Sequence, residues 1–308
     1  VGSEMCIRDR YYGLRDYGND EQIGLEATPE EYIGKLVEVF REVRRVLTND
    51  GTLWVNIGDS YAGSMKGAAQ FPDNAMNYKQ GTNRGTLGKA TLVKQCTNCK
   101  PKDLIGIPWM LAFALRADGW YLRQDIIWSK PNPMPESVRD RCTKSHEYIF
   151  LLSKSRLYYF DADAIKVPAR ESTMRRIRQD VDNQVGSSRT LKANGNMKAV
   201  IGGRKRNFSD MTEDDPMYRA STNREYEYTD KANKRSVWVV STSAFHDAHF
   251  AVFPPALIVD CIKAGCPEDG VVLDPFMGSG TTAIVSRKLN RNYIGFEINK
   301  DYVRLAEN

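Results

Sequence analysis

The first clear pattern along the chain is a helical one that begins at Thr28. Thr28-Pro-Glu-Glu31 has the residues of a capping box, with Pro29 at the first helical position. Apolar residues then recur every three or four positions from Tyr32 to Leu47, and Asn49-Asp-Gly51 supplies a stop signal. The pattern predicts an amphipathic helix over 29–47.

Shorter apolar runs predict strands, and they alternate with further helical patterns. We expect strands at 52–57, 120–128, 147–153, 271–274 and 293–298, and helices at 104–117, 253–263, 281–289 and after Asn299. The stretch 63–95 is rich in Gly, Asn and Lys and predicts a long loop, while the prolines of 130–135 predict an extended turn. The alternation predicts an α/β, doubly wound fold with a mostly parallel sheet.

Composition places the chain among ordinary globular proteins. Of its 308 residues, 41% are apolar and 27% are charged, which excludes collagen-like, disulfide-scaffold and wholly disordered chains. No apolar run approaches the roughly 20 residues that span a bilayer, so we expect no membrane association. Without a visible signal peptide, a reducing cytoplasm is the expected location.

The net charge of +5 is unevenly distributed. Residues 166–206 carry 11 Lys or Arg against 3 Asp or Glu, a local +8 that leaves −3 for the rest. Glycines lie among these cations, and tyrosines follow them before residue 235. A solvated surface is the ordinary explanation, but the combination favours an element that binds the nucleic-acid backbone. The candidate DNA-binding residues are Arg175, Arg176, Arg178, Arg204, Lys205 and Arg206.

The six cysteines predict neither a disulfide framework nor a metal site. Only Cys96-Thr-Asn-Cys99 has a chemically meaningful spacing. Structural zinc needs four ligands, and no second Cys pair or neighbouring His supplies the others. We therefore expect no metal and interpret Cys96 and Cys99 as free thiols in a loop.

A glycine-containing loop predicts a nucleoside-binding site near the end of the chain. Gly278 and Gly280 follow the strand at 271–274 and precede a helix, whose first N–H groups are free to bind a ligand. Glu297, at the expected end of the next strand, could accept hydrogen bonds from ribose hydroxyls. The pattern also fits a dinucleotide fingerprint, which leaves a nicotinamide-dependent oxidoreductase as an alternative. A tight turn without a ligand is the plain explanation.

Asp274-Pro-Phe-Met-Gly-Ser-Gly-Thr-Thr282 resembles the S-adenosylmethionine motif of DNA methyltransferases that methylate N4 of cytosine or N6 of adenine. The segments 11–18, 51–60, 128–135 and 146–148 resemble further blocks of this family. Their order, with the catalytic half before the cofactor half, is that of the family's beta group. The resemblance implies a Rossmann-like fold divided into a catalytic half (11–165), a target-recognition insert (166–235) and a cofactor half (236–308).

The resemblance also implies roles for individual residues. S-adenosyl-L-methionine would be bound by Phe253, Pro254, Asp274, Phe276, Gly278, Gly280, Thr281 and Glu297. Tyr11 would be the aromatic residue of the Ser/Asp-Pro-Pro-Tyr tetrad, which stacks on a target base flipped out of the duplex. Asp59 ends a strand near the presumed target pocket and is the second candidate catalytic residue, although a turn-capping role fits it equally well. The partners implied are double-stranded DNA and a cognate restriction endonuclease.

The chain departs from the family at the tetrad. Arg8, Asp9 and Arg10 stand where Ser/Asp-Pro-Pro is expected. Residues 1–10 have no periodicity, and we interpret them as a leader foreign to the rest, on a chain truncated or altered at its N-terminus. The departure leaves open whether this chain is an active methyltransferase or a methylase-like protein that only binds DNA. The target sequence, the choice of cytosine or adenine, and the oligomeric state are also open.

Other polar and aromatic residues have structural interpretations. We expect His146 to make structural hydrogen bonds and His249 to pack or cap. Trp120, Tyr121 and Trp128 are predicted to lie in the core.

Overall fold

The computed structural model describes residues 6–7, 23–24, 26–62, 98–177, 230–242 and 253–307. The chain divides into two compact units, 1–165 with 235–308, and 166–234. Several residues singled out in the sequence lie outside the described residues, namely Arg8, Asp9, Arg10, Tyr11, Cys96, Arg178, Arg204, Lys205, Arg206 and His249, as does the expected loop at 63–95. Arg176 is described in its backbone alone.

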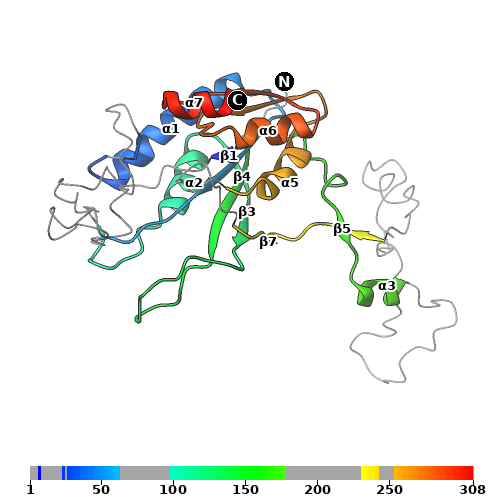
Figure 1. The fold of residues 1–308 in the computed structure, drawn as a ribbon, viewed down its shortest axis with the longest axis horizontal. Coiled ribbons are helices and arrows are strands. Elements are labelled where there is room, and N and C mark those ends of the chain that lie inside the picture. The colour runs from blue at the N-terminus through cyan, green and yellow to red at the C-terminus, as the bar shows by residue number, and fades with distance from the viewer. Residues whose placement is uncertain are drawn as a thin grey trace, which may run out of the picture. The chain divides into compact units, whose positions relative to one another are not determined.

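A five-stranded mixed sheet forms the centre of the first unit (Figure 1). Its order is β1 (Cys6–Ile7), β2 (Thr52–Ile57), β4 (His146–Ser153), β3 (Tyr121–Ser129) and β7 (Val237–Val239). β1 is parallel to β2 and β7 is parallel to β3, but β4 is antiparallel to both of its neighbours. The α/β class is therefore confirmed, with a mixed sheet in place of the mostly parallel one we expected.

β8 (Val271–Asp274) and β9 (Asn292–Gly295) form a separate parallel ladder. Between them lies α6 (Thr281–Lys288), so that strand, helix and strand form one βαβ unit. β9 is shorter than the strand predicted at 293–298, because the chain leaves the ladder at Gly295. Glu297 consequently lies after the strand and not at its end.

α1 (Pro29–Val46) and α2 (Ile107–Ala117) pack on one side of the sheet. The capping box is confirmed, because the Glu31 N–H donates to Thr28 Oγ1 over 3.2 Å. α2 begins three residues later than predicted, after Gly106, which adopts a left-handed φ of +83°. Alternate residues of β2 and β4 enter the core beneath these helices, among them Leu53, Val55, Phe150 and Leu152.

A second core lies on the opposite side of the sheet, beneath α5 (Pro255–Gly265). The intervening residues of the same strands supply it, including Trp54, Ile149 and Leu151. β8 follows the same alternation, since Leu273 belongs to the first core and Val272 to the second. The β8 strand therefore continues the two-sided packing of the central sheet.

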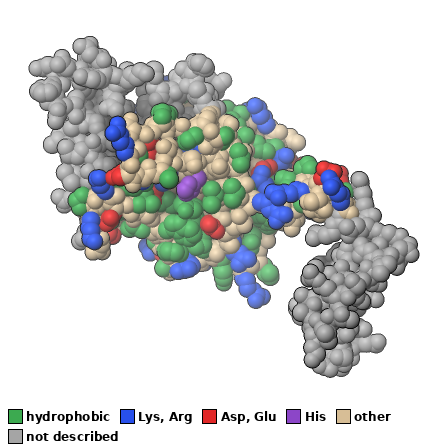
Figure 2. All heavy atoms as spheres, turned by 90° about the horizontal axis from the view of Figure 1, so that it is seen from below, with side chains coloured by type: hydrophobic (Ala, Val, Ile, Leu, Met, Phe, Trp, Pro, Cys, Tyr) green, Lys and Arg blue, Asp and Glu red, His purple; other side chains and the backbone are tan. Residues whose placement is uncertain are grey.

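Two of the three aromatic residues predicted to be buried are buried. Trp120 is 2% exposed and Trp128 is completely buried, but Tyr121 is 46% exposed. Tyr121 is the first residue of β3, and although its neighbours Trp120 and Leu122 contact the first core, Tyr121 does not, so the prediction for it was wrong. The described surface retains other apolar side chains, and hydrophobic residues gather in the middle of the face that Figure 2 shows.

The second unit contains a small antiparallel ladder of β5 (Val167–Pro168) and β6 (Lys231–Ala232), and the short helix α3 (Glu171–Ile177). In α3, Arg175 Nη2 lies 2.7 Å from Glu171 Oε1, and both side chains are exposed. Such a surface pair contributes little to stability. Arg175 thus lies at the surface, and its contact with DNA stays a prediction.

Cysteine pairing differs from our expectation. Cys99 is disulfide-bonded, and its partner is not among the described side chains. Cys142, Cys261 and Cys266 are free. Among the described residues, no cluster of three or more His, Cys, Asp or Glu side chains could hold a metal ion. No helix in the described ranges combines the length and hydrophobicity of a membrane span.

Candidate functional site

The loop between β8 and α6 turns on its two glycines. Gly278 has φ +56° and Gly280 has φ +90°, a left-handed conformation that residues with a Cβ rarely adopt. The Met277 N–H donates to the Phe296 carbonyl over 2.8 Å, and the Gly280 N–H donates to the Met277 carbonyl over 3.1 Å. The loop is therefore fixed to the chain that follows β9 and leads directly into α6.

Asp274, the last residue of β8, holds the loop from inside. It is 1% exposed, and its Oδ1 accepts from the Phe276 N–H over 2.9 Å. Its Oδ2 accepts from the Thr282 hydroxyl over 2.7 Å. Burial raises the pKa of Asp274 to about 7, although these two hydrogen bonds act in the opposite direction. Both oxygens thus organise the loop from within the protein.

Glu297 connects the glycine loop to α7 (Lys300–Glu307). Its Oε2 accepts from the Gly278 N–H over 2.9 Å, and its Oε1 accepts from the Asn299 N–H over 2.8 Å. Each carboxylate oxygen can accept a second hydrogen bond, and the residue is only partly buried. Although Glu297 follows the strand, the structure brings it against the loop with which the sequence associated it.

The two glycines face different surroundings. Within the described part of the chain, a Cβ on Gly278 would meet no atom within 4 Å, whereas one on Gly280 would lie 3.0 Å from the Ala306 Cβ of α7. Gly278 therefore borders open space, and Gly280 allows α7 to pack against the loop. Of the two, Gly278 is the residue whose Cα side is available to a ligand.

The other predicted cofactor residues are buried to different degrees. Phe276 is partly buried against the first core, and Thr281 is 8% exposed at the start of α6. Phe253 and Pro254 are buried, and Phe253 packs into the second core, just before α5. Their contact with a cofactor stays a prediction.

Asp59 has the hydrogen bonds of a helix cap. Its Oδ1 accepts from the N–H groups of Ser60, Gly106 and Ile107, over 2.9, 2.9 and 3.0 Å. Gly106 and Ile107 start α2, whose first N–H groups have no partner within the helix. These bonds match the capping alternative, and a catalytic role for Asp59 stays a prediction.

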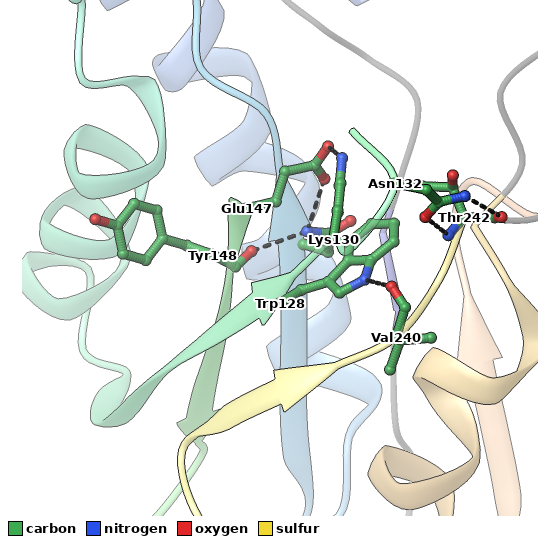
Figure 3. A network of polar contacts seen from close by, with 8 residues as sticks. Trp128, Lys130, Asn132, Glu147, Tyr148, Val240 and Thr242 are labelled. Carbon is green, nitrogen blue, oxygen red and sulfur yellow. Dashed lines mark hydrogen bonds and ion pairs between the residues drawn. The ribbon is translucent and has the colours of Figure 1, made fainter. Parts of the chain in front are cut away.

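A buried polar network lies where β2 and β3 end and β4 begins (Figure 3). The Lys130 ammonium forms an ion pair with Glu147 Oε1. Asn56 Nδ2 donates to Glu147 Oε2 over 3.2 Å and to the Tyr148 carbonyl over 2.9 Å. His146, next to this network, makes an edge contact with the Tyr148 ring at 5.5 Å.

The sequence signalled part of this site and missed the rest. Thr282 was not identified as the partner of Asp274, although its place in the first turn after the second glycine allows its hydroxyl to reach back to the strand. Lys130 and Glu147 are 17 residues apart, and their pairing follows from the β3–β4 register, in which Ser129 lies opposite His146. The only signal in the sequence was a charged residue at each end of the predicted connection between these strands, Lys130 at its start and Glu147 at its end.

Relatives of known type match nearly the whole chain. The type II methyltransferase M.SmaI of Serratia marcescens is 43% identical over 301 residues, which cover 96% of this chain and 80% of that protein. The type II methyltransferase M.Cfr9I of Citrobacter freundii is 42% identical over 313 residues, which cover all of this chain and 81% of that protein.

A solved structure agrees in fold. The PvuII DNA methyltransferase, described as cytosine-N4-specific, superposes with a TM-score of 0.57 at 16% identity, covering 100% of this chain and 78% of its own. Its likeness confirms the Rossmann-like methyltransferase fold. Residues 5–308 match the N6/N4 family described as DNA methylases, whose members use S-adenosylmethionine. With the match spanning both halves of the sequence and relatives above 40% identity, this chain belongs to the N6/N4 DNA methylase family.

Proposed function

We propose that this chain is an S-adenosylmethionine-dependent DNA methyltransferase. It would transfer a methyl group to the exocyclic amine of cytosine (N4) or adenine (N6) in duplex DNA, with the target base flipped out of the helix. The observation that carries the proposal is the glycine loop, where Glu297 binds the Gly278 N–H beside a space that no atom of the described residues fills. Family membership supplies the reaction type.

The residues around this loop fit the cofactor. A Cβ at Gly278 would enter open space, so a ligand can approach the backbone there. Glu297 keeps acceptor capacity for two ribose hydroxyls while it holds the loop. Phe276, partly exposed beside the loop, offers an apolar surface to the methionine portion. When bound, S-adenosylmethionine supplies an electrophilic methyl group on a sulfonium.

The remaining chemistry is positioning of the amine. Its lone pair is delocalised into the base ring, so acceptors that bind its N–H groups are needed to make it a better nucleophile. The nitrogen then forms the new N–C bond, the C–S bond breaks with its electron pair left on sulfur, and the nitrogen loses a proton to water. In this proposal Tyr11 stacks on the flipped base.

DNA would be bound chiefly by the insert at 166–235. Its 166–206 stretch carries 11 cations against 3 acids, and Arg175 is exposed on α3. Neutralising phosphates releases counterions, so binding should weaken steeply as salt is raised. Because its relatives are named type II methyltransferases, we also propose that the chain protects DNA against a cognate restriction endonuclease in the same cytoplasm.

A second candidate is a methylase-like protein that binds DNA without methylating it. The sequence Arg8-Asp9-Arg10 favours this alternative, since it replaces the residues that would hold the amine. Both candidates retain cofactor and DNA binding, and they differ only in methyl transfer. They can therefore be separated by restoring the tetrad.

The experiment measures cofactor binding and methyl transfer separately. The full chain and a variant with Arg8→Ser, Asp9→Pro and Arg10→Pro are titrated calorimetrically with S-adenosylhomocysteine, with NADH as control ligand for an oxidoreductase. Transfer of tritiated methyl groups to unmethylated genomic DNA is then followed for both. We expect both chains to bind S-adenosylhomocysteine and the restored chain to methylate DNA.

Gly278→Val tests the location of the cofactor. The added side chain would fill the open space beside the loop and strain a left-handed residue, so we expect binding of S-adenosylhomocysteine to be lost while the protein stays folded. Unchanged affinity would place the cofactor elsewhere. If neither chain binds S-adenosylhomocysteine, the proposed function is wrong; binding and salt-sensitive DNA association without methyl transfer, even after restoration, would favour the second candidate.

A further inference from the structure

Three polar side chains, of which Asn56 and Glu147 are buried and Lys130 is partly buried, meet at the end of the central sheet and form what we call the edge cluster: Asn56, Lys130 and Glu147. Asn56 is 6% exposed, and the Lys130 and Glu147 side chains are 14% and 8% exposed. Figure 3 shows the Glu147 carboxylate beside the Lys130 ammonium. Polar groups buried to this extent cost free energy unless each one is satisfied.

Lys130 and Glu147 satisfy each other and are fixed by their surroundings. The Lys130 ammonium lies 4.4 Å from the centre of the Trp128 ring, a favourable position for a cation. The Trp128 ring is itself fixed, since its Nε1 donates to the Val240 carbonyl over 2.8 Å. The ion pair therefore presents Glu147 Oε2 to Asn56 as a neutralised and immobile acceptor.

The Asn56 amide has only one orientation in this environment. Its Nδ2 donates both hydrogens, one to Glu147 Oε2 and one to the Tyr148 carbonyl. A flipped amide would put an oxygen against these two acceptors. Oδ1 is consequently held away from them, and it is buried without a hydrogen-bond partner in the described part of the chain. A fixed, buried acceptor that lacks a donor indicates a ligand that supplies one.

The position of this acceptor matches a ligand site of α/β folds. Asn56 is the next-to-last residue of β2, and Lys130 directly follows β3. Val55, which precedes Asn56, pairs with Ile7 at the end of β1. In the sequence, the tetrad positions follow directly after Ile7. Ligands of open α/β sheets bind outside the carboxyl ends of such strands. The acceptor is thus at the end of the sheet where a substrate is expected.

We propose that Asn56 Oδ1 accepts a hydrogen bond from the exocyclic amino group of the target base, with Glu147 and Lys130 as positioning residues. The inference rests on the proposed function and extends it to a contact within the reaction. During methyl transfer the amine nitrogen gains positive charge, so its N–H becomes a stronger donor and the bond to Oδ1 strengthens in the transition state. Such a contact acts on kcat more than on KM.

The test replaces Asn56 with Leu, a residue of similar size that cannot accept. The matched control is Thr52→Val, at the other end of β2, which also removes a buried polar group: Thr52 Oγ1 accepts from Trp54 Nε1 over 3.2 Å. Both changes are made in the chain and in its tetrad-restored variant. We expect Asn56→Leu to lower kcat by about 30-fold or more and to leave KM for DNA within about threefold. Thr52→Val should keep kcat within about threefold of its parent.

The positioning role is tested by a loss and its rescue. Lys130→Met leaves Glu147 without its counter-charge, so it should lower kcat by about tenfold with KM little changed. Adding Glu147→Gln restores a neutral acceptor for Asn56 Nδ2 and should recover most of that loss. Melting temperatures and S-adenosylhomocysteine titrations identify folded variants, and Asn56→Ala is used if Asn56→Leu does not fold.

Each outcome bears on one proposal. A folded Asn56 variant that retains kcat, or that changes only KM, overturns this inference and leaves the proposed function standing. An equal loss of kcat in Thr52→Val would show general damage to the sheet and would also overturn it. Absence of methyl transfer by both parent chains would overturn the proposed function and this contact with it.

Discussion

Replacing Asp274 with asparagine should change how the stability of the chain depends on pH. In the folded protein, burial raises the pKa of Asp274 to about 7, against an ordinary value of about 4 in an unfolded chain. Between these values the folded state binds the proton more tightly, so the free energy of unfolding decreases as the pH rises. This decrease in the free energy of unfolding is absent below about pH 4 and complete above about pH 7.

The magnitude follows from the difference in pKa. About three pKa units correspond to about 4 kcal/mol, of which about 3 kcal/mol falls between pH 5 and pH 8. Asparagine mimics the protonated carboxyl. Its Oδ1 can accept from the Phe276 N–H, and its Nδ2 can donate to the Thr282 hydroxyl, which donates to Asp274 Oδ2 in the wild type. The variant therefore keeps two hydrogen bonds and loses the titration.

Urea unfolding at a series of pH values between about 5 and 8, followed by the fluorescence of the five tryptophans, gives the free energy of unfolding of each protein. Relative to the wild type, we expect the free energy of unfolding of Asp274→Asn to increase by about 3 kcal/mol as the pH rises across this range. Asp140→Asn is the control: that carboxyl is exposed, and its pKa is lowered by the hydrogen bond from Lys102, so it should not titrate in this range. Parallel curves for Asp274→Asn and wild type would refute the assigned environment of Asp274.

Two further predictions concern the glycine loop and the second candidate catalytic residue. Gly280→Ala should destabilise the protein by about 1–3 kcal/mol. The loss should exceed that of Gly278→Ala, because only the Gly280 variant brings a Cβ to 3.0 Å from Ala306. Equal melting temperatures of the two variants would contradict the packing of α7. Asp59→Ala should lower the free energy of unfolding by about 1 kcal/mol through loss of the α2 cap, as measured by urea unfolding. A folded variant that loses methyl transfer without losing stability would instead support a catalytic Asp59.

Local signals predicted most elements, and long-range pairing could not be predicted. α1 was placed to within one residue because Thr28 and Pro29 determine its start. Glu297 was placed on a strand because Phe296 and Ile298 continue the apolar pattern, but β9 stops where its pairing with Asp274 ends. Alternation along β4 shows which residues share a face, yet it says nothing of strand direction, so the antiparallel pairing was missed.

The site shows the same division. The glycine loop and Glu297 were found because their chemistry is encoded within about 25 residues of sequence. The roles of Asp274 and Asp59 depend on which N–H groups surround them, and these come from other segments in the case of Asp59. The edge cluster requires the registers of two strand pairs, which no spacing in the sequence reveals.

β4 has a consequence for the folding of the first unit. It pairs with strands on both sides, and its residues alternate between the two cores, Phe150 and Leu152 entering one and Ile149 and Leu151 the other. Neither core can be completed until this strand is in place, and neither can be lost without releasing it. The halves on either side of the sheet are therefore expected to fold and unfold together as one cooperative transition, although the helices that cover them, α1 and α5, lie far apart in the chain.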